Sequence, residues 1–294
     1  MIKVLLTGRD GQLGQELVAT QPADVELIAT SRAELDLADG EACQAAVLRH
    51  RPDWVLNAGA YTAVDRAESE SELAQAVNAG APEAFATTLA RTGGRLLQVS
   101  TDFVFNGEQG SPYAPEQARQ PLGVYGASKA GGEAAIQRWL PESQHCILRT
   151  SWVYGPVGKN FLLTMLRLHR SKASANEELA VVADQVGCPT GTPGLAQACW
   201  AGIRQGVGGV LHWSDAGAAS WYDFAVAIGE VGVCLGRLDK AAQVQPIPCR
   251  DYPTPARRPA YSLLDCDESR KILGLEAKHW RTALTEVIRR VPVP

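Results

Sequence analysis

Short apolar runs alternate with helical patterns through the first half of the chain. Runs that are mostly apolar and too short for a helix predict buried strands at residues 2–7, 26–30 and 95–99. A further strand and its exit are predicted within residues 54–62. Helical spacing predicts helices at residues 15–20 and 73–90, the second interrupted near Gly80 and Pro82. This alternation predicts an α/β fold: a Rossmann-like, doubly wound parallel sheet with right-handed connections.

The pattern changes in the second half of the chain. A strand that runs into an aromatic loop is predicted at residues 146–155, a short strand and turn at 181–190, and a strand at 210–213. Helices are predicted at 160–170, 220–230, 263–273 and 280–290. Ser220 and Asp223 have the spacing of a helix-capping pair. Prolines exclude regular structure at 252–259. We therefore expect a smaller lobe that is attached to the sheet and suited to holding a substrate.

Composition narrows the class of protein. Hydrophobic residues make up 46% of the 294 residues and charged residues 20%, and the net charge of −4 without a dense Lys/Arg run argues against a nucleic-acid partner. No apolar run approaches the ~18 residues that span a bilayer, and the N-terminus lacks a signal-peptide layout. Seven scattered cysteines without a C-x-x-C pair indicate neither a zinc site nor disulfides. We expect a cytoplasmic protein without a membrane partner.

The first predicted strand ends in a glycine-rich loop with G-x-x-G-x-x-G spacing. Such glycines let the backbone approach a pyrophosphate, and the free N–H groups of the following helix meet its negative charge. The alternative is an ordinary glycine-rich turn. The position directly after an N-terminal strand favours a dinucleotide. The candidate contacts in this loop are Gly8, Asp10, Gly11, Gln12, Leu13 and Gly14.

The end of the second strand carries Thr30, Ser31 and Arg32, where an acid would bind a free ribose 2′-hydroxyl. Hydroxyls and a guanidinium suit a 2′-phosphate, so NADPH is favoured over NADH, which stays possible. The alternative is a capped loop with an exposed arginine. Asp36, which precedes Leu37 in an apolar setting, is a candidate contact to the adenine edge.

Tyr125 and Lys129 lie four residues apart near the start of a predicted helix that ends at Pro141, so they share one face. A free tyrosine has a pKa of about 10. A neighbouring ammonium and a second positive charge, such as an oxidised nicotinamide ring, would lower that pKa toward about 7. Tyrosine and lysine at this spacing are also typical of a solvated helix face.

Two further groups are candidates for substrate contacts. Ser100, Thr101 and Asp102 follow the strand at 95–99, and the carboxyl ends of parallel strands face the ligand crevice. Such residues also commonly cap a helix. Arg257 and Arg258, between prolines, have the chemistry to neutralise a substrate diphosphate, and such pairs as often face solvent.

Together these motifs resemble the extended short-chain dehydrogenase/reductases, and among them the dTDP-4-dehydrorhamnose reductase family. The likeness runs through residues 7–14, 57–68, 100–107, 124–133, 149–154, 184–190 and 252–259. It implies NAD(P)H-dependent reduction of the C4 ketone of a nucleotide sugar, dTDP-4-dehydro-L-rhamnose. The product, dTDP-L-rhamnose, serves the synthesis of cell-surface polysaccharides such as lipopolysaccharide.

The resemblance also implies roles for individual residues. Tyr125 would be the proton donor, Lys129 its partner and a contact to the nicotinamide ribose, and Thr101 the hydroxyl that polarises the sugar carbonyl. Asp102 and Trp152 would contact the substrate, Trp152 by packing against the deoxysugar. Besides the glycine loop, the implied cofactor contacts are Thr30, Asp36, Leu37, Ala60, Tyr61, Thr62 and Val99.

The resemblance further implies two lobes that are discontinuous in sequence. The NAD(P)-binding lobe would contain residues 1–150 with segments near 178–197 and 236–260. The substrate-binding lobe would contain residues 151–177, 198–235 and 261–294.

Members of the resembled family can form homodimers around a magnesium ion held by glutamates. Glu16 and Glu286 match two of those positions, whereas Thr192 and Pro193 stand where a third glutamate would be. The resemblance therefore makes Mg²⁺ and a homodimer candidates without supplying a complete ligand set.

Three other functions stay open. A 4,6-dehydratase of the same superfamily would place an acid after Asp102, where this chain has Phe103. A sugar-nucleotide 4-epimerase would retain its cofactor and show no net oxidation. A non-catalytic regulatory subunit has no need of Thr101, Tyr125 and Lys129 together, so their joint presence favours an enzyme.

Overall fold

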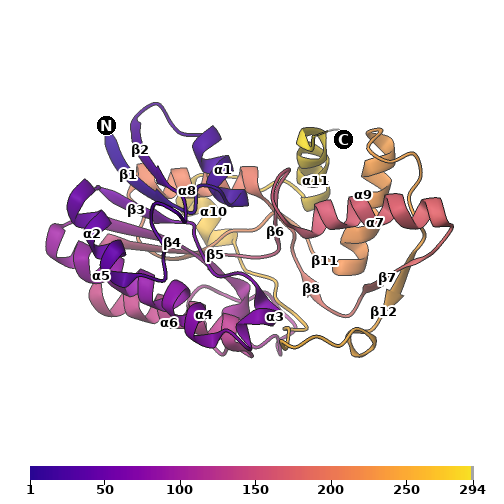
Figure 1. Cartoon of the computed structure of the whole chain (residues 1–294), viewed down its shortest axis with the longest axis horizontal. Helices are drawn as coiled ribbons and strands as arrows, with labels where there is room; N and C mark the ends of the chain where they lie inside the picture. Colours follow the sequence, from indigo (N-terminus) through magenta and orange to yellow (C-terminus); the bar gives the residue numbers. More distant parts are fainter. Residues whose placement is uncertain (293–294) are drawn as a thin grey trace.

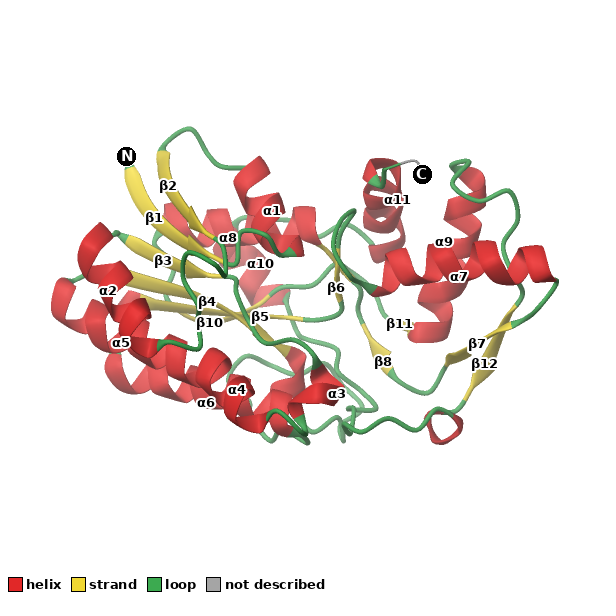
Figure 2. Ribbon diagram, in the orientation of Figure 1, coloured by secondary structure: helices red, strands yellow, loops and turns green. Residues whose placement is uncertain are grey.

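A six-stranded parallel sheet forms the centre of the first lobe (Figures 1 and 2), in the order β10-β5-β4-β3-β1-β2. The computed structural model describes residues 1–292. The chain order reverses between β1 and β3, which confirms the predicted doubly wound sheet. The strands are β1 (Ile2–Thr7), β2 (Val25–Thr30), β3 (Trp54–Asn57), β4 (Arg95–Thr101), β5 (His145–Thr150) and β10 (Gly209–His212).

Helices cover both faces of this sheet, because successive strand residues point to opposite sides. In β1, Val4 and Leu6 join one buried cluster and Leu5 joins the other. Strands buried on both faces are continuously apolar, which explains the predicted pattern. One face carries α1 (Gln12–Ala19), α8 (Thr192–Gln205) and α10 (Asp267–Leu273); the other carries α2 (Gly40–His50), α5 (Ala81–Thr92) and α6 (Val124–Trp139).

A second lobe with its own apolar core lies beside the sheet (Figure 1). Its helices α7 (Phe161–Ala175), α9 (Trp221–Cys234) and α11 (Trp280–Arg290) surround buried side chains such as Phe224 and Leu284. Three short strand pairs complete the region and its junction with the sheet. They are β7 (Leu179–Val182) with β12 (Val244–Ile247), β8 (Val186–Gly187) with β11 (Ala219–Ser220), and β6 (Val153–Tyr154) with β9 (Thr190–Gly191).

The division between the lobes differs from the predicted boundaries in three places. Helix α10 packs on the sheet, although residues 261–294 were predicted for the second lobe. Strand β10 pairs with β5, and α8 packs on the sheet, so the first part of 198–235 lies with the sheet rather than in the second lobe. Conversely, β7 and β12 pair with each other and pack on α9, so the segments near 178–197 and 236–260 lie partly in the second lobe. These pairings join residues far apart in sequence, which local periodicity does not determine.

Some local features agree with the prediction, and other helices differ from it in their bounds. Ser220 caps α9, and the Asp223 carboxylate accepts a hydrogen bond from the Ser220 backbone N–H at 2.8 Å, as the capping pattern predicted. The helix that was expected to break near Gly80 continues instead through a π-helical segment, Ala76–Gly80. It links α4 (Ser71–Gln75), which follows α3 (Val64–Ala67), to α5. Helix α10 starts at Asp267 rather than at residue 263, because Leu264 forms a β-bridge with Tyr113.

Two whole-chain features complete the fold. All seven cysteines are free, and five of them are buried. Within residues 1–292, no helix combines the length and the apolar character that are needed to cross a membrane.

Candidate active site

A cleft of about 800 Å³ lies at the carboxyl ends of the central strands. Its walls include residues that follow β1, β3, β4 and β5, together with residues of the second lobe such as Lys159 and Trp221. The carboxyl ends of parallel strands meet at one edge of a sheet, so loops far apart in sequence converge there. The doubly wound parallel sheet predicted from the sequence placed a ligand crevice at this edge.

The glycine loop has the tight geometry that close approach to a phosphate requires. Gly8 has φ +72°, and a Cβ atom there would lie 2.7 Å from the Gly59 Cα atom. A Cβ at Gly14 would lie 2.0 Å from the Gly8 carbonyl oxygen, so this glycine packs behind the loop and does not line the cleft. Gly11 caps α1 without a side-chain hydrogen bond, which leaves the N–H groups of the first turn available for an anion. The loop therefore fits the pyrophosphate of a dinucleotide.

The end of β2 places only some of its predicted contacts in the cleft. Arg32 and Asp36 line it, and the largely exposed Arg32 side chain lies with its Nε atom 3.8 Å from Asp36. Thr30 instead donates its hydroxyl hydrogen bond to the Leu6 carbonyl at 3.0 Å. Ser31 donates to Glu34 at 2.8 Å. Neither Thr30 nor Ser31 lines the cleft, so Arg32 is the group at this end of β2 that can meet a 2′-phosphate.

The four residues proposed for chemistry converge in this cleft. Tyr125 lies in the first turn of α6 and Lys129 one turn later, opposite Thr101 and Asp102 at the end of β4. The Lys129 ammonium donates a hydrogen bond to the Val99 carbonyl at 2.7 Å. The Thr101 hydroxyl donates to Asp102 Oδ1 at 3.0 Å. Within residues 1–292, Asp102 Oδ2 is buried without a hydrogen-bond partner, so it can accept one from a ligand hydroxyl.

Burial dominates the ionisation of these groups. It raises the pKa of Tyr125 to about 12, although the Thr101 hydroxyl acts in the opposite direction. Burial also lowers the pKa of Lys129 to about 8, against the attraction of Glu133. It raises the pKa of Asp102 to about 6. The expected lowering of the Tyr125 pKa is therefore not found in the free protein, because desolvation disfavours the phenolate and a backbone carbonyl binds the lysine. Tyr125 keeps its proton at neutral pH.

An aromatic pair forms the wall on the side of the second lobe. Trp152 has φ +46°, an uncommon conformation for a bulky residue, and its ring stacks on Trp221 with centroids 3.6 Å apart and planes 5° apart. Both rings line the cleft. Trp152 was expected there, whereas Trp221 was not. A tryptophan at the start of a helix carries no local signal for a binding site.

The two arginines of the proline-rich loop lie in different places, one in the cleft and one outside it. Arg258 lines the cleft, and its guanidinium donates to both carboxylate oxygens of Asp65, at 3.0 and 2.8 Å, and to Thr254. Its charge is therefore already balanced, and it ties the loop to α3. Arg257 does not line the cleft. Neither arginine is free inside the cleft to bind a diphosphate.

The cleft contains further residues that sequence reasoning did not single out as site residues. They lie on helices, strands and loops that are far apart in sequence and meet only in the folded chain, so no local pattern identified them. Besides Trp221 they are Leu35, Ala58, Gly59, Val64, Leu73, Val77, Phe103, Thr150, Ser151, Val153, Gly158, Lys159 and Leu195.

The two candidate magnesium ligands are bonded to cationic side chains of the same chain. The buried Glu16 carboxylate accepts hydrogen bonds from Arg290 at 3.0 and 2.7 Å. The Glu286 carboxylate accepts from Lys278 at 2.6 and 2.7 Å. No group of three or more His, Cys, Asp or Glu side chains among residues 1–292 is arranged to hold a metal. These residues do not fit a Mg²⁺ site, which needs carboxylate oxygens free to coordinate.

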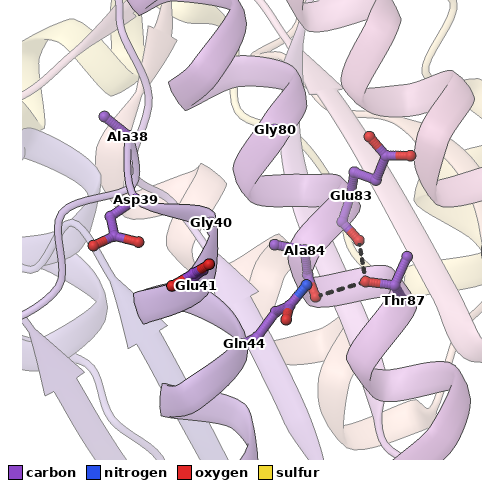
Figure 3. A pocket seen from close by; sticks show the side chains of 9 residues that line it. All are labelled: Ala38, Asp39, Gly40, Glu41, Gln44, Gly80, Glu83, Ala84 and Thr87. Carbon is purple, nitrogen blue, oxygen red and sulfur yellow. Dashed lines mark hydrogen bonds between the residues drawn. The ribbon is translucent and has the colours of Figure 1, made fainter.

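A second hollow lies on the surface between α2 and α5 (Figure 3). The acidic side chains of Asp39, Glu41 and Glu83 are among its nine lining residues. The Thr87 hydroxyl there is hydrogen-bonded to the backbone carbonyls of Glu83 and Ala84. The hollow shares no residue with the cleft and contains no cation to oppose its carboxylates, so it brings together no catalytic chemistry.

A doubly wound sheet with a glycine loop, a Tyr–Lys pair and a threonine at one edge defines a dinucleotide-binding oxidoreductase. Comparison with known proteins gives the family: the model for the RmlD substrate binding domain matches residues 2–293. The chain belongs to this family. It is 38% identical to a dTDP-4-dehydrorhamnose reductase of Sinorhizobium fredii, over 98% of this chain and 97% of that protein.

Solved structures agree with this assignment. A dTDP-4-dehydrorhamnose reductase of Clostridium acetobutylicum superposes with a TM-score of 0.89 at 35% identity, covering 98% of this chain and 99% of that one. A dTDP-4-dehydrorhamnose reductase of Bacillus anthracis, solved in complex with NADP, has the same TM-score and coverage at 31% identity. The fold predicted from the sequence is thereby confirmed across nearly the whole chain.

Proposed function

We propose that this chain catalyses the NADPH-dependent reduction of the C4 ketone of dTDP-4-dehydro-L-rhamnose to dTDP-L-rhamnose. The observation that carries the proposal is that Tyr125, Thr101 and Lys129 lie together in the cleft that contains the glycine loop. Ketone reduction needs a proton donor beside a hydride source. A phenol with a pKa of about 12 holds its proton at neutral pH until charge develops on the ketone oxygen.

Each side chain then has a distinct task. When bound, NADPH supplies the hydride that adds to the carbonyl carbon. Tyr125 gives its proton to the carbonyl oxygen. The Thr101 hydroxyl, which donates to Asp102 in the free protein, turns to donate its hydrogen bond to the same carbonyl oxygen. The Lys129 ammonium stabilises the phenolate that remains on Tyr125. Asp102, through its unpartnered Oδ2, accepts a hydrogen bond from a sugar hydroxyl.

The two lobes bind different molecules, one the cofactor and the other the nucleotide sugar. The sheet lobe holds the cofactor, with its pyrophosphate at Gly11 and the start of α1 and its 2′-phosphate near Arg32. NADH would use the same site without that last contact. The complex of the Bacillus anthracis relative with NADP supports this choice of cofactor. The second lobe holds the nucleotide sugar against Trp152 and Trp221.

A sugar-nucleotide 4-epimerase of the same superfamily is the main alternative, because it would use a similar Tyr–Lys pair. An epimerase shows no net consumption of cofactor, whereas the reductase consumes one NADPH for each ketone. A 4,6-dehydratase is disfavoured because Phe103, next to Asp102 in the cleft, has no proton to give or accept. We place the activity in the cytoplasm, where NADPH is available.

The test is nicotinamide absorbance with dTDP-4-dehydro-L-rhamnose, made in situ from dTDP-4-dehydro-6-deoxyglucose and a 3,5-epimerase. NADPH and NADH are compared, and the Tyr125→Phe variant is the matched control because it removes only the hydroxyl. We expect fast oxidation of NADPH by the wild type. Tight cofactor binding without oxidation would refute the reductase and favour the epimerase or a regulatory subunit.

A further inference from the structure

A buried carboxylate, Glu133, lies one helical turn beyond Lys129 on α6 and is not used in the chemistry described above. Its side chain is fully buried. It accepts hydrogen bonds from the Ser100 hydroxyl at 2.5 Å and from Arg149 Nε and Nη2 at 3.0 and 2.7 Å. Arg119 adds a fourth hydrogen bond at 3.2 Å. A buried charge is costly unless it is paired and hydrogen-bonded. The position of Glu133 is therefore tightly restricted by its hydrogen-bond partners.

The partners of Glu133 lie on the strands that carry the site. Ser100 stands between Val99 and Thr101 on β4, and its register partner on β5 is Arg149. Consecutive β4 residues therefore hold consecutive turns of α6: the Val99 carbonyl binds Lys129, and the Ser100 hydroxyl binds Glu133. Two attachments one turn apart restrict both the sliding and the rotation of a helix on a strand.

We propose that Glu133 is a positioning residue that locks α6 onto β4 and β5, so that Tyr125 and Lys129 face Thr101. The inference rests on the proposed reductase function, since it concerns the same reaction. Because Tyr125 and Lys129 precede Glu133 on one helix, a slip at Glu133 moves both groups relative to the β4 edge. Misplacement of reacting groups by about 1 Å can cost ~10²-fold in rate.

Glu133 also has an electrostatic effect on Lys129. Its negative charge raises the pKa of Lys129, against the lowering by burial. The other ionisable groups around the pair are Tyr125 and Asp102 in the cleft, and Arg119, Arg149 and His212 around the carboxylate. His212 contributes no charge, because burial and the nearby Arg149 lower its pKa to about 3. Removing the charge of Glu133 should therefore make Lys129 lose its proton at lower pH.

The decisive variant is Glu133→Gln, which keeps the shape and removes the charge. Gln137→Ala is the matched control, because Gln137 lies one turn further along α6 and binds only the outer Arg119, at 3.0 Å. We expect Glu133→Gln to lower kcat by roughly 10- to 100-fold. We also expect the alkaline fall in kcat/KM of this variant to occur about one pH unit lower than in the wild type, because Lys129 loses the negative charge of Glu133 nearby. Gln137→Ala should keep the wild-type profile.

A second variant covers the case in which Glu133→Gln fails to fold because Arg149 is left without its counter-charge. Glu133→Met combined with Arg149→Met replaces the buried pair by apolar groups, an exchange that proteins often tolerate. It should move the alkaline fall in the same direction but by less, because the nearer negative charge and the more distant positive charge are removed together. NMR of ¹³Cε-labelled lysine, with Lys129 assigned through Lys129→Arg, follows the same titration without any sugar.

The outcomes separate the two proposals. A folded charge-free variant with the wild-type kcat and an unshifted Lys129 titration overturns the role of Glu133, whatever the substrate is. A wild type that oxidises no NADPH with the ketosugar overturns the reductase instead. In that case the NMR titration still tests whether Glu133 controls Lys129.

Discussion

Raising the pH above about 8 should slow the proposed reduction, because Lys129 then loses its proton. Burial lowers the pKa of this lysine to about 8, so the ammonium is present below that pH and is lost as the pH rises through it. The charged form is the active one, since an ammonium stabilises the phenolate left on Tyr125 and a neutral amine does not. Tyr125, with a pKa of about 12, does not titrate in this range.

The magnitude follows from the position of that pKa. With a pKa of about 8, Lys129 is about 90% protonated at pH 7, about 50% at pH 8 and about 10% at pH 9. If only the protonated form is active, kcat/KM falls roughly tenfold between pH 7 and pH 9. The measurements start at pH 7, above the pKa of Asp102 of about 6, so that the titration of Asp102 does not overlap with that of Lys129.

The assay is initial-rate oxidation of NADPH in overlapping buffers of constant ionic strength. The kcat/KM value for NADPH is the quantity of interest, because it reports the ionisations of the free protein. Lys129→Arg is the matched variant: a guanidinium stays charged throughout, so its activity, although lower, should not show the alkaline fall. A wild-type profile that stays flat to pH 9, or the same fall in Lys129→Arg, would refute the assignment of this limb to Lys129.

Three further predictions follow from the site. Tyr125→Phe should lower kcat by about 10²–10⁴-fold and leave the NADPH dissociation constant nearly unchanged, because only the proton donor is lost; turnover close to wild type would contradict its role. Arg32→Ala should raise KM for NADPH roughly tenfold and leave KM for NADH unchanged, as expected for one exposed charge-assisted contact; an equal change for both cofactors would exclude a 2′-phosphate contact. Removing divalent cations with EDTA should change neither the melting temperature nor the sedimentation coefficient, because Arg290 already neutralises Glu16; a loss of several degrees that Mg²⁺ restores would show that a metal competes for that carboxylate.

Local sequence determined the parts of this protein that depend on neighbouring residues. The apolar runs of β1 and β4, the capping pair of α9 and the glycine turn at Gly8 each follow from spacing within about ten residues. The same holds for Tyr125 and Lys129, because one helical turn brings them together wherever the helix lies. These features identified the fold class and the residues proposed for the chemistry.

The tertiary structure decided what depends on burial and on partners far apart in sequence. Strand β10 belongs to the sheet because it pairs with β5. Trp221 lies in the cleft because the second lobe packs with this ring against Trp152. Thr30 and Ser31, which were predicted to contact the cofactor, donate their hydroxyl hydrogen bonds to Leu6 and Glu34, and neither residue lines the cleft. In the free protein, burial raises the pKa of Tyr125, and burial is a property of the folded chain. The lowering that the sequence predicted depends on a second positive charge, such as an oxidised nicotinamide ring, beside Lys129.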